Sequence, residues 1–274
     1  MLRGAEIAMQ REPGLEVSII GPVPPCNLPV YQADDEDEVH AILEKLLDEK
    51  ELDGVVTMHY PFPIGVATIG KVVTPVRGKE MYIASTTGTS DPDRIQAMIK
   101  NAVFGVAAAR ADGIVNPTLG ILNVDGARQV ERYLNVMKSR GYDFSWGESQ
   151  RADGGQILRG NDLILGSVDV VLCDTLTGNI LMKLFSSFNS GGDYETMGYG
   201  YGPGVGENFD RLICIISRAS GSPVIAGAIN YCASMVKGGL QKIAAGEIRK
   251  AKQAGWEIPA APTVLVDAKE EVTP

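Results

Sequence analysis

Two kinds of residue that often carry chemistry are scarce in this sequence. It has four cysteines, no two of them in a C-x-x-C pair, and two histidines, His40 and His59. A structural zinc site needs closely spaced cysteine and histidine ligands, so we predict no metal site. Cys173 and Cys214 lie inside apolar runs. We interpret them as buried free thiols of a reducing compartment, which predicts a cytoplasmic protein.

Signatures of nucleotide binding and of a nucleophilic serine are missing as well. The sequence contains neither the G-x-x-x-x-G-K-[ST] motif of P-loop proteins nor the G-x-S-x-G motif of α/β-hydrolases. Glycine stands at alternate positions in GYGYGPGVG, residues 198–206, which does not fit the G-x-G-x-x-G spacing of a dinucleotide site. We interpret this stretch as a flexible loop or lid.

Excess positive charge and long apolar runs are also lacking. The formal net charge is −9, which disfavours nucleic acid and anionic membrane surfaces as partners. Apolar runs are no longer than a strand needs, so no integral membrane segment is expected. Met1 leads straight into helix-like sequence without a signal-peptide pattern, and we expect a natural N-terminal strand to be absent.

What the sequence does contain is an alternation of strand-like and helix-like segments. The expected strands are 16–21, 52–60, 81–86, 117–125, 168–174 and 211–217. The expected helices are 2–12, 40–50, 94–113, 127–140, 179–188 and 223–255. This alternation predicts an α/β fold, with a mostly parallel sheet between two helical layers. We expect one domain over residues 1–255, which could be divided into two lobes, and a poorly packed tail over 256–274.

The strand that ends at Asp174 leads into the strongest candidate site. Thr177, Gly178 and Asn179 open the helix that follows it. Ligands of parallel sheets bind beyond the carboxyl ends of the strands, so the hydroxyl and bare amides here could bind an anion with help from the helix dipole. Lys183, one turn past Asn179, could add positive charge. The alternative is an ordinary helix cap with Lys183 in solvent.

Other strand ends carry polar side chains too. Asn123 and Asp125 follow the strand at 117–125, with Arg128 in the next helical turn, although Asp125 could simply be an N-cap. The strand at 211–217 is followed by an arginine flanked by hydroxyls, a pattern suited to phosphate because guanidinium binds oxyanions bidentately; an ordinary salt bridge is the alternative. The residues of this third group are Ser217, Arg218, Ser220 and Ser222.

Two weaker candidates complete the set. The hydroxyl-rich segment 85–94 precedes a helix and ends in Arg94, and a cap by Ser90 or Asp91 explains it equally well. His59 follows a strand and could act as a base, although a lone loop histidine is more often structural or solvated. Hydroxyl-rich strand ends without a nucleophile triad suit phosphate binding and oxyanion stabilisation during acyl transfer.

Two segments resemble the PlsX phosphate acyltransferase family. They are RGNDLILGSVDVVLCDTLTGNILMK (159–183) and PTLGILNVD (117–125). The resemblance extends from residue 2 to about 245. It implies a fold like that of isocitrate and isopropylmalate dehydrogenases, a homodimer, and catalytic roles for Asn161, Asp174 and Lys183. Inorganic phosphate would be the co-substrate, with no other cofactor.

Four further segments are similar to one branch of this superfamily, the alpha subunit of component C of the glycine/sarcosine/betaine reductase complex. They are VTMHYPFPIG (56–65), STTGTS (85–90), ILNVDGARQVER (121–132) and GYGYGPG (198–204). Leu163 and Thr175-Leu176 depart from the PlsX pattern, which has Glu and Gly-Phe there. This resemblance implies release of a protein-bound acetyl thioester as acetyl phosphate, alongside a beta subunit. It also implies a C-terminal segment with a reactive cysteine, which we expect this chain to lack; we interpret Cys232 as a packing residue.

Three alternatives to an acetyl-transferring enzyme stay open. One is a phosphate acyltransferase that uses long-chain acyl carrier protein in phospholipid synthesis. Another is a decarboxylating dehydrogenase, which would need a cluster of metal-binding aspartates that the sequence does not display. The third is a non-catalytic subunit of a larger complex.

Overall fold

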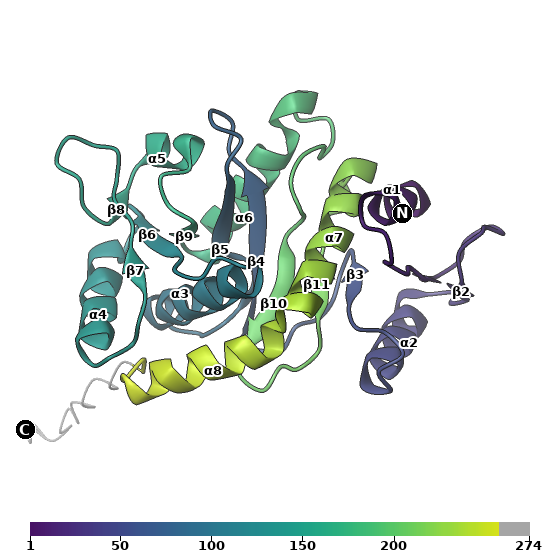
Figure 1. Cartoon of the computed structure of the whole chain (residues 1–274), viewed down its shortest axis with the longest axis horizontal. Helices are drawn as coiled ribbons and strands as arrows, with labels where there is room; N and C mark the ends of the chain where they lie inside the picture. The colour runs from purple at the N-terminus through teal and green to yellow at the C-terminus, as the bar shows by residue number, and fades with distance from the viewer. Residues whose placement is uncertain (258–274) are drawn as a thin grey trace, which may run out of the picture.

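This computed structural model describes residues 1–257 of the chain. A nine-stranded sheet forms its centre (Figure 1). Its order is β3-β11-β10-β4-β5-β9-β6-β7, and β8 also pairs with β6. Its strands are β3 (Val55–Thr57), β4 (Val66–Val73), β5 (Glu80–Thr89), β6 (Thr118–Leu122), β7 (Ser145–Trp146), β8 (Ile157–Leu158), β9 (Val170–Leu172), β10 (Gly202–Gly206) and β11 (Ile213–Ile215). A separate parallel pair is formed by β1 (Ile19–Ile20) and β2 (Val30–Tyr31).

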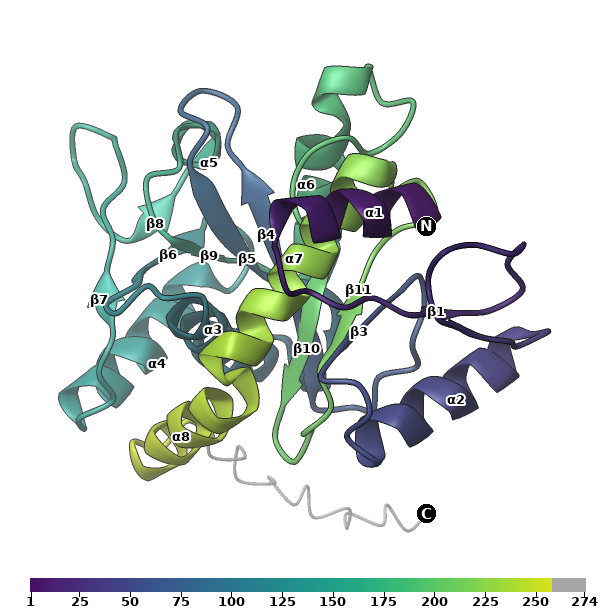
Figure 2. The ribbon, with the colours of Figure 1, turned by 45° about the vertical axis from the view of Figure 1, so that its right-hand side comes forward.

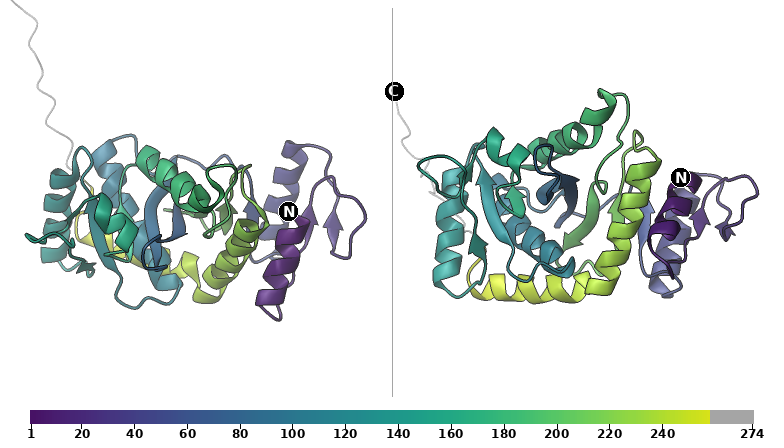
Figure 3. Two further views of the ribbon diagram at one scale, coloured as in Figure 1. Left: turned by 90° about the horizontal axis from the view of Figure 1, so that it is seen from above. Right: turned by 45° about the horizontal axis from the view of Figure 1, so that its top comes forward.

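Helices cover both faces of the large sheet (Figures 2 and 3). They are α1 (Leu2–Arg11), α2 (Glu36–Asp48), α3 (Arg94–Ala111), α4 (Ala127–Ser139), α5 (Gly160–Leu165), α6 (Thr175–Ser187), α7 (Ser222–Gly238) and α8 (Leu240–Gln253), with a short 3-10 helix η1 (Phe188–Ser190). The core of one face contains residues of α3, α4, α7 and α8, and the core of the other contains residues of α2, α5 and α6. Helix α1 packs on α7.

Alternate residues of the central strands feed these two cores, as the period of a strand requires. In β9, for example, Val170 and Leu172 join one core and Val171 joins the other. The predicted α/β fold with three layers is therefore confirmed.

Strand directions divide the sheet into two sets. Neighbours β5, β9 and β6 are parallel to one another, and β3 is parallel to β11. Between these groups, β10 is antiparallel to both β11 and β4, and β4 is antiparallel to β5. The carboxyl end of β11 therefore lies at the opposite end of the sheet from those of β5, β9 and β6. The mostly parallel sheet is confirmed, but the polar strand end that follows β11 does not lie with those that follow β5, β9 and β6.

The stretch 198–206 was predicted to be a loop or lid, and this prediction is wrong for residues 202–206. Its second half is β10, which lies buried between β11 and β4. A Cβ at Gly202 would lie 1.7 Å from the Ile69 carbonyl oxygen, and one at Gly204 would lie 2.4 Å from the Phe62 ring. Glycine is required here because neighbouring backbone and rings approach closely, a reason that glycine spacing alone does not reveal.

Strand β4 was not predicted, and it contains a lysine, Lys71. Lys71 is buried, and its ammonium group contacts Glu80 and Asp112, each at 2.7 Å. The rings of Tyr199 and Tyr231 also face it, with centroids 4.4 and 5.4 Å from Nζ. A buried lysine is stable only with such partners, and they come from segments distant in sequence.

The predicted helix over 223–255 is two helices, α7 and α8, which meet at Gly238 and Gly239. The tail was predicted to be poorly packed from Trp256 onward, and at that residue the prediction is wrong. Trp256 is 2% exposed, and its carbonyl accepts a hydrogen bond from Gln96 Nε2 at 2.8 Å. Residues 258–274 lie outside the described residues.

Cys173 and Cys214 are fully buried and free, as predicted. Within residues 1–257, none of the helices is long and apolar enough to cross a membrane.

Candidate functional site

A pocket of about 290 Å³ opens where β5 and β9 end. Helices α3 and α6 both begin beside it, so two helix N-termini with their positive partial charges face the same space. This arrangement suits an anion. The residues that line the pocket are Gly88, Thr89, Ser90, Asp91, Arg94, Ala97, Met98, Asn101, Asp174 and Thr175.

The floor of the pocket holds an unsatisfied polar group. Asn101 is 1% exposed, and its Nδ2 donates to Ser85 Oγ at 3.2 Å, while its Oδ1 has no partner among the described residues. Ser85 Oγ lies 2.8 Å from Thr175 Oγ1. A buried unpaired acceptor costs about 1–3 kcal/mol, so such a group points to a ligand. Rotating the amide by half a turn would present its N–H donors instead, and either orientation leaves a polar group for a ligand.

Asp174 holds the mouth of the pocket in order. Its carboxylate caps α6 by accepting from the Thr177 amide at 3.1 Å and the Thr177 hydroxyl at 2.7 Å. It also contacts Arg94 at 3.3 Å. Partial burial acts to raise the pKa of Asp174, but the Thr177 hydrogen bonds and the Arg94 charge outweigh it and hold this pKa below its usual value. The group is therefore ionised near neutral pH.

The sequence analysis proposed that Thr177 and Gly178 could donate hydrogen bonds to an anion. In the structure their donors are already used within the protein. Both polar groups of Thr177 bind Asp174, and the Gly178 amide donates to the Asp174 carbonyl. A Cβ at Gly178 would lie 1.9 Å from the Ser85 carbonyl oxygen. Gly178 thus lets α6 approach β5, and the alternative of an ordinary cap describes these two residues better.

The other residues of this motif are dispersed. Asn179 donates to the Thr86 carbonyl at 3.1 Å, which ties α6 to β5. Lys183 is exposed, lies further along α6, and donates to the Tyr201 hydroxyl at 3.2 Å. Asn161 is exposed on α5 and is not among the residues that line the pocket.

A residue that sequence reasoning passed over lies beside Asn161. Asp162 is buried, and its carboxylate accepts from the Ser149 and Ser167 hydroxyls at 2.8 and 3.0 Å. Ser149 precedes α5 and Ser167 follows it, so the Asp162 carboxylate links the two loops that flank this helix.

Asn123 and Asp125 follow β6 at the same end of the sheet as the pocket. The Asn123 side chain is exposed, and Asp125 is 93% exposed, with its carboxylate 3.6 Å from Arg94. Arg128 pairs with Glu131 at 3.1 Å on the surface of α4. The structure therefore brings together Arg94, Asp125 and Asp174, of which Arg94 was only a weak candidate.

The third predicted group, after β11, lies at the opposite end of the sheet. Ser217 and Ser220 are joined within one turn, where the Ser217 amide donates to Ser220 Oγ at 3.0 Å. Ser220 donates to the buried Glu195 carboxylate at 2.6 Å, and the Tyr201 hydroxyl donates to the same carboxylate at 3.0 Å. Arg218 is exposed and has no ion pair within residues 1–257. These hydroxyls close a turn around Glu195.

Cys232 is buried in α7 among apolar residues, which agrees with a packing role. His59 lies 3.1 Å from Glu36, outside the set of residues that line the pocket.

Asn101 is a pocket residue that the sequence analysis missed. The only signal was an asparagine inside the apolar helical run NAVFGVAAA at 101–109. A polar residue on a fully buried helical face needs a partner, and that need identifies it.

Comparisons with known proteins agree with this architecture. The family model for fatty acid synthesis proteins matches residues 1–272. The glycine/sarcosine/betaine reductase complex component C subunit alpha of Peptoclostridium acidaminophilum is 51% identical over 257 residues, which cover 94% of this chain and 67% of that protein. A phosphate acyltransferase of Thermotoga maritima is 25% identical over 217 residues, or 67% of this chain and 63% of that protein. The chain thus spans about two thirds of the length of each.

Among solved structures, a branched-chain phosphotransacylase from Enterococcus faecalis V583 shares the fold. The TM-score is 0.58 at 13% sequence identity, and the match covers 86% of this chain and 94% of that one.

Proposed function

The chain belongs to the family of fatty acid synthesis proteins, and from this premise we propose that it is an acyltransferase that moves an acyl group from a thioester to inorganic phosphate. The observation that carries the proposal is the pocket between the N-termini of α3 and α6. It combines two positive helix ends, one arginine, paired hydroxyls and an unsatisfied buried amide. These are groups that bind phosphate and stabilise an oxyanion.

In the proposed reaction a phosphate oxygen attacks the thioester carbonyl carbon, the carbon–sulfur bond breaks, and the thiol leaves. Arg94 binds phosphate through its guanidinium group, and the first amides of α6, at Thr175 and Leu176, have no helical acceptor and donate to the same anion. Asn101 fixes the orientation of phosphate from below. No cofactor beyond phosphate is proposed.

Asp174 has a positioning role in this mechanism. Because its pKa is lowered, it stays a carboxylate near neutral pH and does not donate a proton. Arg94 contacts Asp174 and, at a longer distance, Asp125. These two contacts keep the guanidinium group at the mouth of the pocket. Lys183 and Asn161 are given no part in the transfer, since neither lines the pocket.

We propose acetyl as the acyl group. The support is the 51% identity to a component C alpha subunit, together with a pocket of about 290 Å³, which suits a small acyl group and phosphate. A long-chain acyl carrier protein is the competing donor.

The test compares the two donors directly. The purified chain is incubated with phosphate or arsenate and either an acetyl or a long-chain acyl thioester, and thioester loss is followed. We expect loss of the acetyl thioester that depends on arsenate. A preference for the long-chain donor would reassign the substrate. If neither thioester is lost while calorimetry still shows phosphate binding, the chain would be a non-catalytic subunit rather than an enzyme.

A homodimer, a beta-subunit partner and a cytoplasmic location complete the proposal. The exposed side of α6 supports a partner of this kind, because Leu176, Ile180 and Leu184 form an apolar stripe that continues to Phe188. We expect a second copy of the chain to cover it. Light scattering of the wild type and of Ile180→Glu measures this: a dimer that becomes a monomer supports the homodimer, and a wild-type monomer contradicts it.

A further inference from the structure

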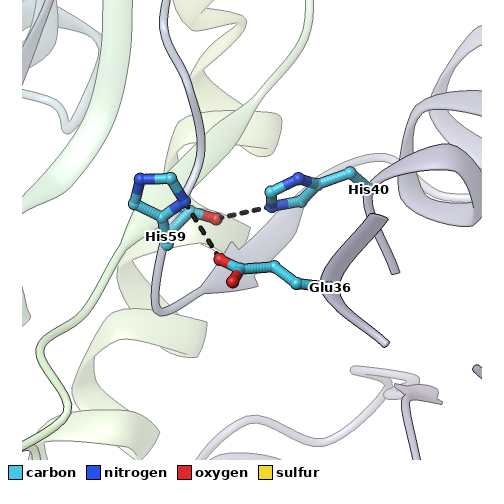
Figure 4. Close-up of side chains that lie close together, drawn as sticks. All are labelled: Glu36, His40 and His59. Atoms are coloured by element: carbon cyan, nitrogen blue, oxygen red, sulfur yellow. Dashed lines mark hydrogen bonds and ion pairs between the residues drawn. The ribbon is translucent and has the colours of Figure 1, made fainter. Parts of the chain in front are cut away.

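Both histidines of the chain meet at one place on the surface (Figure 4). Glu36 and His40 are four residues apart on α2, so they share one face of that helix. His59 comes from the loop after β3 and lies opposite them, with its ring centroid 6.0 Å from that of His40. Two imidazoles and a carboxylate from two separate segments therefore point toward a common space.

The spacing of the three side chains is close to that of a metal-ligand set. One ligand atom from each residue lies within 4.8 Å of the other two. His59 Nδ1 is 3.1 Å from Glu36 Oε1. Ligands of a tetrahedral zinc ion with bonds of about 2.0–2.1 Å are separated by about 3.3 Å, so rotations of surface side chains suffice to close the set.

One present contact must be exchanged, and the structure allows it. His40 Nε2 lies 3.1 Å from the His59 carbonyl oxygen. That oxygen also accepts from the Thr57 hydroxyl at 3.2 Å, so it keeps a donor when His40 turns toward an ion. His40 already packs edge-on against the Tyr60 ring, at a centroid distance of 5.8 Å, which limits its freedom.

The local charge also favours a cation. The acidic run Asp34–Glu38 surrounds the start of α2, and its members Asp35 and Glu38 are used as caps of the local backbone. Glu36 is the acidic residue of this run that faces the histidines.

We propose that Glu36, His40 and His59 form a binding site for a divalent transition-metal ion of the zinc type. Two imidazole nitrogens and one carboxylate oxygen match the ligand preference of Zn²⁺ and leave a position for water. The prediction of no metal site rested on the lack of closely spaced cysteine and histidine ligands in the sequence, whereas the fold brings the two histidines together with Glu36.

The site is separate from the proposed acyl transfer. It lies after β3, the strand at one edge of the sheet, whose carboxyl end faces away from the pocket beside β5 and β9. A bound ion would join α2 to the loop that connects β3 to β4, and so stabilise the docking of α2 on the sheet.

The test is a zinc titration of the tag-free, chelator-treated full chain, followed by calorimetry and by imidazole ¹⁵N spectra. The chain has two histidines, so the spectrum reports on this site alone. We expect binding of one ion per chain, with both imidazoles shifting together and the melting temperature rising. Shifts of neither imidazole, or of one alone, would overturn the proposal.

Variants distinguish ligation from general attraction of cations. Loss of an outer-shell partner already weakens metal binding about 10–100-fold, so His59→Ala and Glu36→Gln are each expected to weaken it at least that much. Asp37→Asn removes the same charge from the same helical turn and is expected to leave the affinity unchanged. Equal affinity in all three variants, with folding verified by circular dichroism, would contradict the site.

Discussion

The two ends of the sheet carry similar side chains but differ in whether their polar atoms are satisfied. At the β5–β9 end, the Asn101 side-chain oxygen at the floor of the pocket has no partner among residues 1–257, and Arg94 contacts two carboxylates at 3.3 and 3.6 Å. At the β11 end, Ser217 and Ser220 are consumed by a turn around the buried Glu195. Hydroxyls after a strand are therefore insufficient to mark a site. Unpaired buried atoms beside a cavity mark it.

The largest effect is expected for Gly178→Ala, because the new methyl group would collide with the Ser85 carbonyl oxygen at 1.9 Å. We expect the free energy of unfolding to fall by about 3 kcal/mol, the upper part of the range for overpacking. Gly246→Ala is the matched control: it is also inside a helix, but no atom of residues 1–257 lies within 4 Å of the added Cβ. It should stabilise the protein by about 0.5–1 kcal/mol. Equal urea midpoints for the two variants would show that Gly178 has no packing role.

The second prediction compares the arginines at the two ends. Arg94→Ala removes a charge-assisted contact worth about 1.5–3 kcal/mol, so kcat/KM for phosphate should fall about 10–100-fold. Arg218→Ala should change kcat/KM for phosphate by less than about twofold, because Arg218 lies at the opposite end of the sheet from the pocket, in a turn whose hydroxyls are already hydrogen-bonded. Steady-state kinetics with varied phosphate measures both. A larger loss for Arg218→Ala would exchange the roles of the two ends.

The third prediction concerns stability at the β11 end. Ser220→Ala leaves one oxygen of the buried Glu195 without its donor, so unfolding should become easier by about 1–2 kcal/mol. Ser222→Ala, at the start of α7, is expected to have little effect. The KM for phosphate should be unchanged in both, and a raised KM for Ser220→Ala alone would indicate that this end binds substrate.

The smallest effect is a pH dependence from Asp174. A carboxyl whose pKa is lowered on folding stabilises the protein above its unfolded pKa, and this stability is lost as the pH falls through the folded value. The free energy of unfolding should therefore drop below about pH 4. Asp174→Asn keeps a side chain suited to an N-cap and should make that drop shallower. Denaturant unfolding between neutral and acid pH measures the slope, and an identical slope in the variant would contradict the assignment.

Elements with a strong local pattern could be predicted from the sequence. The helix expected at 94–113 is α3, Arg94–Ala111, and the apolar strand at 168–174 contains β9. In contrast, β4 was missed because Lys71 is buried by partners from distant segments. Strand β10 was missed because its glycines are required by the close approach of residues distant in sequence, which the local sequence does not reveal.

The sequence by itself determined the alternation of elements, the polar strand ends and the family motif at 159–183. Only the tertiary structure decided which strand ends meet, since the period of a strand is the same in parallel and antiparallel pairs. The direction of β11 depends on β10 inserting between it and β4, a pairing of segments more than a hundred residues apart. The insertion of β10 places Ser217 at the other end of the sheet, and the parallel pairing of β5 with β9 places Arg94 beside Asp174. His40 meets His59 because α2 packs beside the loop that follows β3.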